Sequence, residues 1–370
     1  LRELELDWNC CRWLWNHAVA TKRAGKGWLS DKDLTRLRSE LPWLGAGSVV
    51  TQQQTLRIFR ASRNARSFKS ARRDLPSLNY TKRGFSIKDG RLCLPRKTSI
   101  PVVWSRELPS SPSSVRVYKD SLGHWYASFV VEREETPLPA TGRAVGVDWG
   151  VKRVATTSVD GFDLEHPEHG RRAAQRLAKY QRRMARRKPK PGKRASRGYR
   201  KAKHAAAKQY RKVARQRQDT ARKWVRKVVQ EFDEIAVEDF KPKFLSRGKM
   251  ARKAADAAIG VAKRELEEYA NRAGRQVILV PPAYTTMTCG VCATRTKSRI
   301  PLEQRTFHCD SCGHMEDRDR NAARAILAAA GFNRAGADVV RQPNPPSGGK
   351  GCEPSQESPS FRAGRIQRFQ

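Results

Sequence analysis

The sequence predicts an α/β protein of several domains, and three observations support that fold class. With 370 residues the chain is longer than a typical single domain. Apolar residues follow a helical spacing near the N-terminus, short alternating runs come next, and buried-type strands alternate with helices after residue 140. Four cysteines interrupt the last part of this alternation. We therefore expect an α/β domain with an inserted zinc ribbon, preceded by a helical region and a small β-barrel domain.

Charge limits the kind of partner. The chain has 76 Lys and Arg against 36 Asp and Glu, a net charge of +40. Such an excess suits a long phosphate backbone better than a small acidic substrate. A membrane surface is the rival polyanion, but the sequence shows no lipid anchor, signal peptide or apolar run of membrane length. We expect a cytoplasmic protein that binds nucleic acid and no membrane.

Residues 1–75 are predicted to be helical. Trp8, Cys11 and Trp15 recur at spacings of three and four residues, as on one face of a helix. A second helix is predicted over residues 51–70, and arginines recur on it at every third position: Arg57, Arg60, Arg63 and Arg66. This stripe is either a solvated face or a surface for phosphates.

Residues 76–140 are predicted to form the small β domain. Alternating runs such as 114–118 and 125–131 are separated by hairpin signals at Asp89-Gly90 and at 120–123. The segment Pro137-Leu138-Pro139 then indicates a linker.

Residues 141–285 are predicted to form the α/β domain. Its expected elements are strands and helices in alternation: strands 144–151 and 153–158, basic helices within 171–232, strand 235–239, helix 251–273 and strand 275–280. The basic helices are broken at Pro189, Pro191 and Gly192, and residues 171–227 hold 25 Lys and Arg against the single acid Asp219. Four arginines of the first helix are candidate contacts to a nucleic-acid backbone: Arg182, Arg183, Arg186 and Arg187.

Two cysteine pairs, separated by sixteen residues, lie within the predicted ribbon 286–316: Cys289, Cys292, Cys309 and Cys312. Four thiolates complete a tetrahedral shell with no open position, so we expect one structural Zn²⁺. Disulfides are the alternative, and the few other cysteines and the absence of a signal peptide count against them. A closing helix, 317–332, follows, and the tail 333–370 is predicted to be flexible.

Three acids are the candidate catalytic residues: Asp148, Glu238 and Asp319. They lie on a first strand, at the end of a later strand and at the start of the closing helix, which matches an RNase H-type nuclease plan. Hydrolysis of a phosphodiester by in-line attack uses two divalent ions about 4 Å apart, and Mg²⁺ requires hard oxygen ligands. Asp239 and Asp317 are close alternatives to Glu238 and Asp319, because adjacent strand residues point to opposite faces and an acid often caps a helix.

Three motifs carry a resemblance to the TnpB proteins of bacterial transposons and to their relatives, the miniature type V CRISPR effectors. Residues 145–152, Val-Gly-Val-Asp-Trp-Gly-Val-Lys, resemble the family's first RuvC motif. Residues 235–240, Ile-Ala-Val-Glu-Asp-Phe, resemble the second, and residues 317–323, Asp-Arg-Asp-Arg-Asn-Ala-Ala, resemble the third. By this resemblance the metal-binding acids are Asp148, Glu238 and Asp319. Residues 10–16 resemble an early helix of the family and residues 125–131 a strand of its wedge domain. The family normally has a short strand segment before that helix, which begins here at Leu1, so we expect either a truncated chain or one without that segment.

The resemblance implies an RNA-guided DNA endonuclease. A guide RNA is expected on the basic helices and the wedge, and the target double-stranded DNA is expected to be cut beside a short adjacent motif by a two-metal RuvC site. Such a protein works in the bacterial cytoplasm at the nucleoid, with one chain or two on each RNA. Two alternatives remain, a guided DNA binder that represses without cleavage and a guide-free nuclease.

Overall fold

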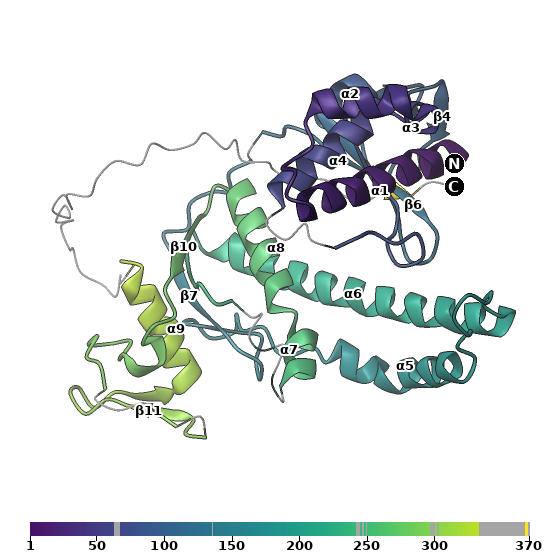
Figure 1. Ribbon diagram of the computed structural model, residues 1–370. Helices are drawn as coiled ribbons and strands as arrows, with labels where there is room; N and C mark the ends of the chain where they lie inside the picture. Colours follow the sequence, from purple (N-terminus) through teal and green to yellow (C-terminus); the bar gives the residue numbers. More distant parts are fainter. Residues whose placement is uncertain are drawn as a thin grey trace. The chain divides into compact units, whose positions relative to one another are not determined.

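The computed structural model describes residues 1–62, 67–134, 136–241, 245, 248, 250–296, 300–301, 303–332 and 367–368 (Figure 1). The chain divides into two compact units, Leu1–Glu134 with Lys350–Gln370, and Glu135–Gly349. Arg63 and Arg66 lie outside the described residues, and so does the predicted flexible tail except for its residues 367 and 368.

The first unit begins with helices: α1 (Arg2–Arg23), α2 (Asp31–Glu40), α3 (Pro42–Gly45) and α4 (Val49–Ala61). Ser30 starts α2 with a capping box, in which its hydroxyl accepts from the Asp33 N–H and the Asp33 carboxylate accepts from the Ser30 N–H. The predicted helix 51–70 is too long, because α4 ends at Ala61 and the described residues 67–70 are not helical. One apolar core joins α1, α2 and α4 through buried side chains that include Leu14, Leu34 and Phe59.

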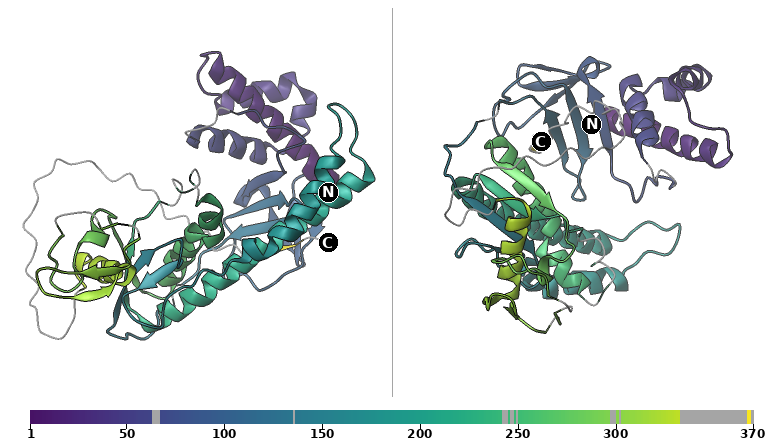
Figure 2. Two further views of the ribbon diagram at one scale, coloured as in Figure 1. Left: turned by 90° about the horizontal axis from the view of Figure 1, so that it is seen from below. Right: turned by 90° about the vertical axis from the view of Figure 1, so that its left-hand side faces the viewer.

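Two antiparallel sheets complete this unit, and the right view of Figure 2 shows strands from residues 77–130 in blue. One has the order β1-β5-β6-β13 and the other β2-β3-β4. The strands of both sheets are β1 (Ser77–Thr81), β2 (Ser86–Lys88), β3 (Arg91–Leu94), β4 (Thr98–Pro101), β5 (Ser114–Lys119), β6 (Trp125–Val130) and β13 (Gln367–Arg368), and the 3₁₀ turn η1 (Lys82–Gly84) lies between β1 and β2. Leu4, Trp8 and Cys11 of α1 pack into the core that the two sheets share. Closure of these sheets into a barrel stays a prediction.

The second unit is built on a four-stranded sheet of order β10-β9-β7-β8. Its strands are β7 (Ala144–Trp149), β8 (Ala155–Thr157), β9 (Glu234–Glu238) and β10 (Gln276–Val280). β10, β9 and β7 are parallel, and β8 pairs antiparallel with β7 as the second strand of a hairpin. Such mixed sheets are covered by helices on both faces.

Different helices cover the two faces of this sheet. α6 (Arg197–Glu231) and α8 (Ile259–Arg272) pack on Val145, Val147 and Val237. α9 (Arg318–Ala329) packs on the opposite face, where Ile326 contacts Ala236. Since side chains alternate along a strand, Gly146, Asp148, Ala236 and Glu238 belong to the face of α9.

Outside the sheet, α5 (His169–Arg186) runs beside α6 as a helical hairpin, visible in teal in Figure 1. The predicted single helix 251–273 is wrong, because it breaks into α7 (Ala251–Ala257) and α8 at Ala258, whose φ is +55°. After β10 come the 3₁₀ turn η3 (Thr285–Met287) and the hairpin β11 (Thr306–His308) and β12 (Met315–Asp317), which leads into α9. No helix in the described ranges combines the length and apolarity needed to cross a membrane.

Candidate active site

Asp148 and Glu238 lie at neighbouring positions on adjacent parallel strands. β7 and β9 are paired in register from Ala144 with Glu234 to Val147 with Val237. The next residues are Asp148 on β7 and Glu238 on β9. Their backbones are therefore about 5 Å apart, the spacing of neighbouring strands, and their side chains lie on the same face of the sheet. Both side chains are buried, with exposed fractions of 9% and 7%.

Asp319 reaches the same place from α9, and Gly146 sets how closely that helix approaches. A methyl group at Gly146 would overlap the carbonyl group of Ala323. Ala323 lies one helical turn after Asp319, and Gly146 lies two residues before Asp148 on the same face of β7. The contact between Gly146 and Ala323 thus brings Asp319 to the carboxylate of Asp148.

The two acids that the sequence left as alternatives have other contacts. The Asp239 carboxylate pairs with Lys263 of α8, with an N···O distance of 2.7 Å. Asp317 caps α9, because its carboxylate accepts from the backbone N–H groups of Asp319 at 3.0 Å and Arg320 at 3.2 Å. Glu238 and Asp319 are the acids on the side of Asp148.

Burial and mutual repulsion dominate the electrostatics of this cluster. Burial raises the pKa of Asp148 well above its usual value, and the negative charges of Glu238 and Asp319 raise it further, although Arg318 lowers it. The pKa of Glu238 is raised to about 7, chiefly by burial, and Lys263 and a hydrogen bond from the Thr285 side chain partly offset this effect. Such a cluster favours a bound cation.

The sequence analysis missed four residues around the acids. Arg318 is buried and donates to the carbonyl of Pro301 at 3.0 Å, and Arg305 pairs with the Asp319 carboxylate at 3.2 Å. Lys263 and Thr285 are the neighbours of Glu238. Arg318 follows directly on an acid of the third motif, which was a usable signal. Arg305, Lys263 and Thr285 lie in other segments of the chain, and nothing in their local sequence indicated a place beside the acids.

The oxygen-rich donor set suits Mg²⁺, although the acids do not form a closed cage. In the described ranges the four cysteines are the only group of at least three possible ligands whose ligand atoms all lie within 4.8 Å of one another. Asp319 instead pairs with Arg305 and, at 3.5 Å, with Arg318. Two ions about 4 Å apart need a more open arrangement than one tetrahedral ion.

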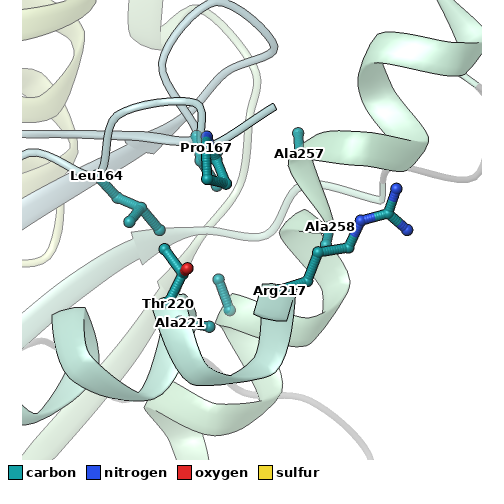
Figure 3. Close-up of a pocket in the computed structure, with 9 residues that line it drawn as sticks. Leu164, Pro167, Arg217, Thr220, Ala221, Ala257 and Ala258 are labelled. Atoms are coloured by element: carbon teal, nitrogen blue, oxygen red, sulfur yellow. The ribbon is translucent and has the colours of Figure 1, made fainter. Parts of the chain in front are cut away.

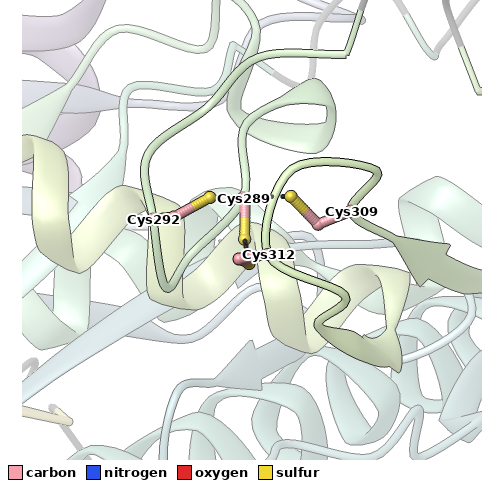
Figure 4. Close-up of side chains that lie close together, drawn as sticks. All are labelled: Cys289, Cys292, Cys309 and Cys312. Carbon is pink, nitrogen blue, oxygen red and sulfur yellow. Dashed lines mark hydrogen bonds between the residues drawn. The ribbon is translucent and has the colours of Figure 1, made fainter.

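The four predicted cysteines meet in space (Figure 4). The sulfur atoms of Cys289 and Cys312 are 3.7 Å apart, and those of Cys292 and Cys309 are 3.5 Å apart. Four sulfurs at about these separations fit one tetrahedral Zn²⁺, with Zn–S bonds near 2.3 Å. This quartet and the hairpin β11–β12 agree with the expected ribbon.

Asn321 joins the ribbon to the helix that carries Asp319. Its side chain is fully buried, its oxygen accepts from the Gly290 N–H at 2.8 Å, and its amide donates to the Thr288 carbonyl at 2.9 Å. Gly290 permits this contact, since a methyl there would collide with the side chain of Arg324. The position of the first cysteine pair therefore depends directly on α9.

The four candidate arginines lie at the C-terminal end of α5, beside the turn of the helical hairpin. Arg182, Arg183 and Arg186 are exposed on the last turns of α5, and Arg187 is exposed just after them. The Arg187 side chain lies against Gly198 at the start of α6. The lone acid of this region, Asp219, is paired with Lys223 at 2.8 Å. Unpaired cations on a rigid hairpin suit a phosphate backbone.

A small cavity lies on the other face of the sheet, and its size excludes a nucleic-acid substrate. Leu164, Pro167, Arg217 and Ala258 are among its lining residues (Figure 3). Its volume of about 10 Å³ has room for roughly one water molecule.

Comparisons with known proteins show which proteins have a similar sequence and fold. Residues 128–247 match the family model OrfB_IS605, described as a probable transposase, and residues 261–326 match the TNB domain of Cas12f1-like proteins. A cryo-EM structure of a Cas12f1–sgRNA–target DNA complex is similar with a TM-score of 0.51 and 14% identity, over 88% of this chain and 81% of that chain. The protein therefore has the α/β fold of the Cas12f type.

Curated relatives give the family. A Streptomyces pristinaespiralis protein named RNA-guided DNA endonuclease is 31% identical over 92% of this chain and 88% of its own length. The Escherichia coli K12 protein named RNA-guided DNA endonuclease InsQ is 27% identical over 70% of this chain and 66% of its own length. The chain belongs to the TnpB-like family, as the three sequence motifs predicted.

Proposed function

We propose that this protein is an RNA-guided endonuclease that cleaves target DNA beside a short adjacent motif. The observation that carries the proposal is the meeting of Asp148, Glu238 and Asp319 from β7, β9 and α9, in a chain with a net charge of +40. The cluster supports phosphodiester chemistry, and the charge supports a nucleic-acid partner. The names of the relatives support guidance by RNA.

In this proposal the three acids act together. Asp148, Glu238 and Asp319 would together hold the two Mg²⁺ ions, and Asp148 is the acid on which the charges of the other two act. When bound, the ions activate a water molecule and stabilise the leaving oxygen. Lys263 and Thr285 keep the Glu238 carboxylate oriented, and Asn321 keeps Asp319 in place through the ribbon.

The remaining parts of the chain have positioning roles. The arginines Arg182, Arg183, Arg186 and Arg187 hold the backbone of the guide RNA or of its duplex with the target. The β domain, residues 76–140, acts as the wedge, and the ribbon, residues 286–316, holds one structural Zn²⁺ and contacts target DNA. Base pairing then reads the sequence, and the protein reads backbone and shape.

The test is cleavage of matched and unmatched target DNA by the protein loaded with guide RNA. Asp148→Ala, Glu238→Gln and Asp319→Ala should each lower Mg²⁺-dependent cleavage by roughly 10³-fold, because a lost metal ligand removes several kcal/mol of transition-state stabilisation. Binding of guide and target should stay near that of the unaltered protein. Asp219→Asn is the control, since this acid is exposed on α6 and paired with Lys223, and the variant should still cut.

Each result decides between functions. Retained cleavage in one of the three variants removes that acid from the site. Cleavage of unmatched DNA without RNA points to a guide-free nuclease, and tight guided binding without any cleavage points to a repressor.

A further inference from the structure

Tyr284 has an unusual position at the junction of β10 and the ribbon. Its side chain is 53% exposed, although a ring of this size normally packs inward. Its φ of +66° lies in the left-handed region, which is uncommon for any residue except glycine. Strain of this kind persists when the surrounding contacts hold it in place.

Local hydrogen bonds hold the backbone of Tyr284. Its carbonyl accepts from the Met287 N–H at 2.9 Å and from the Thr288 hydroxyl at 3.0 Å. Thr288 in turn forms an antiparallel bridge with Arg295. The guanidinium of Arg295, itself an exposed residue, lies 3.1 Å from the centre of the Tyr284 ring. Ring and guanidinium therefore form a fixed, solvent-facing pair.

This pair lies beside the candidate active site. Thr285, the next residue after Tyr284, is buried, and its side chain is hydrogen-bonded to Glu238. The turn η3 that Tyr284 starts packs against α9, which carries Asp319. The exposed ring is thus one residue from a contact to a catalytic acid.

The chemistry of the pair fits single-stranded nucleic acid. An aromatic face stacks on any base, and an arginine beside it adds a cation for the base or for the neighbouring phosphate. The Tyr284 ring faces solvent, and the Arg295 guanidinium lies against it. We propose that Tyr284 and Arg295 form a stacking subsite for one base of the DNA strand that is cut at the carboxylate cluster.

The subsite rests on the proposed function and deepens it. A base held at Tyr284 fixes the strand so that a nearby phosphate reaches Asp148, Glu238 and Asp319. Stacking tolerates every base, so the subsite positions the strand without reading its sequence. Its loss should therefore lower the cleavage rate alike on targets of different sequence.

The experiment combines protein variants with abasic substitutions in the target. Guide-loaded protein carrying Tyr284→Ala or Tyr284→Leu should cleave roughly 5- to 100-fold more slowly, which is the range of one lost stacking contact. Tyr284→Phe is the matched control and should stay within about twofold, since the flat ring remains. Zinc content and guide binding should be unchanged in all three.

The decisive measurement is an abasic site moved one nucleotide at a time along the cut strand. At one position it should slow the unaltered protein by the same factor as Tyr284→Ala, and it should slow the Tyr284→Ala variant no further. The subsite would be overturned if the abasic site slowed the Tyr284→Ala variant, at every position, by the same factor as the unaltered protein. It would also be overturned if the Tyr284→Phe variant cut as slowly as Tyr284→Ala. Cleavage by the unaltered protein in the same assay tests the proposed function separately.

Discussion

Gly146 decides at the scale of one residue how the cluster of acids forms. Because glycine has no side chain, the backbone of α9 lies directly on β7. This contact sets the position of Asp319 on α9. A glycine inside a buried strand often marks such a close approach. The sequence around Asp148 therefore contained a sign of a helix packed on this strand.

Asp256 gives a prediction on stability. Its buried carboxylate accepts from the N–H groups of Gly170 at 2.6 Å and Arg171 at 2.9 Å, and it pairs with Arg217 at 2.9 Å. Burial alone would raise the pKa of Asp256, but these partners outweigh it and the pKa lies below its usual value. Asp256→Asn should lower the free energy of unfolding at pH 7 by about 1–3 kcal/mol.

The effect of Asp256 should depend on pH. Because its pKa is lower in the folded state, its stabilisation is complete above the unfolded pKa, near 4, and is lost as pH falls. Thermal unfolding of both proteins should show a gap that narrows below pH 4. Asp219→Asn, which removes an exposed acid paired with Lys223, is the control and should leave the midpoint unchanged. A gap that stays constant with pH would contradict the role of the charge.

The residue types of the candidate site could be predicted from the sequence, but their neighbours could not. Glu238 and Asp239 are adjacent, and only the packing of α9 on one face and of α8 on the other separates them. Arg305 and Thr285 reach the acids across long sequence separations, so no local pattern indicated them. The helix 251–273 breaks at Ala258, two residues before Gly260, and Asp256 of α7 reaches the start of α5.

At the scale of elements, the ribbon should depend on its metal. Cys289→Ser should reduce bound zinc from about one per chain to near zero, because three thiolates no longer close the shell. Cleavage should fall with it, since Asn321 ties this cysteine pair to the helix of Asp319. Elemental analysis and a cleavage assay measure both effects. Cys93 lies outside the quartet, so the Cys93→Ser variant should keep its zinc. If the unaltered protein contained no zinc, the proposed zinc site would be wrong.

The helical hairpin should bind through charge. Replacing Arg182, Arg183, Arg186 and Arg187 by Gln should weaken RNA binding alike for every guide sequence. Each lost phosphate contact should lower the slope of log affinity against log salt by roughly 0.7 to 0.9. Lys223→Gln is the control, because its charge is already paired with Asp219. An unchanged slope in the fourfold variant would assign RNA binding to another surface.

At the scale of the whole molecule, net charge should link stability to RNA. A charge of +40 repels itself, and a bound polyanion removes that repulsion. Guide RNA should therefore raise the melting temperature, and the gain should shrink between 0.1 M and 1 M salt as the Debye length falls from about 10 Å to 3 Å. Differential scanning fluorimetry with and without RNA measures this. An equal gain at both salt concentrations would contradict the electrostatic origin.

The order of the elements in the second unit was predictable because each rests on a local pattern. Strands were indicated by apolar runs, the hairpin of α5 and α6 by its proline and glycine break, and the ribbon by cysteine spacing. Which helices cover which face of the sheet could not be predicted. That choice depends on contacts between segments far apart in the sequence, such as Gly146 with Ala323, and periodicity reports only on neighbours.

The place of α9 at the end of the second unit has a consequence for synthesis. β7 carries Asp148 and leaves the ribosome early, while α9 carries Asp319 and is made about 170 residues later. A nascent chain that has released both basic helices, but not yet residues 318–329, would expose the surface proposed for RNA and lack one of the three candidate acids. The cationic hairpin would thus be available to RNA before the chain could assemble the proposed cleavage site.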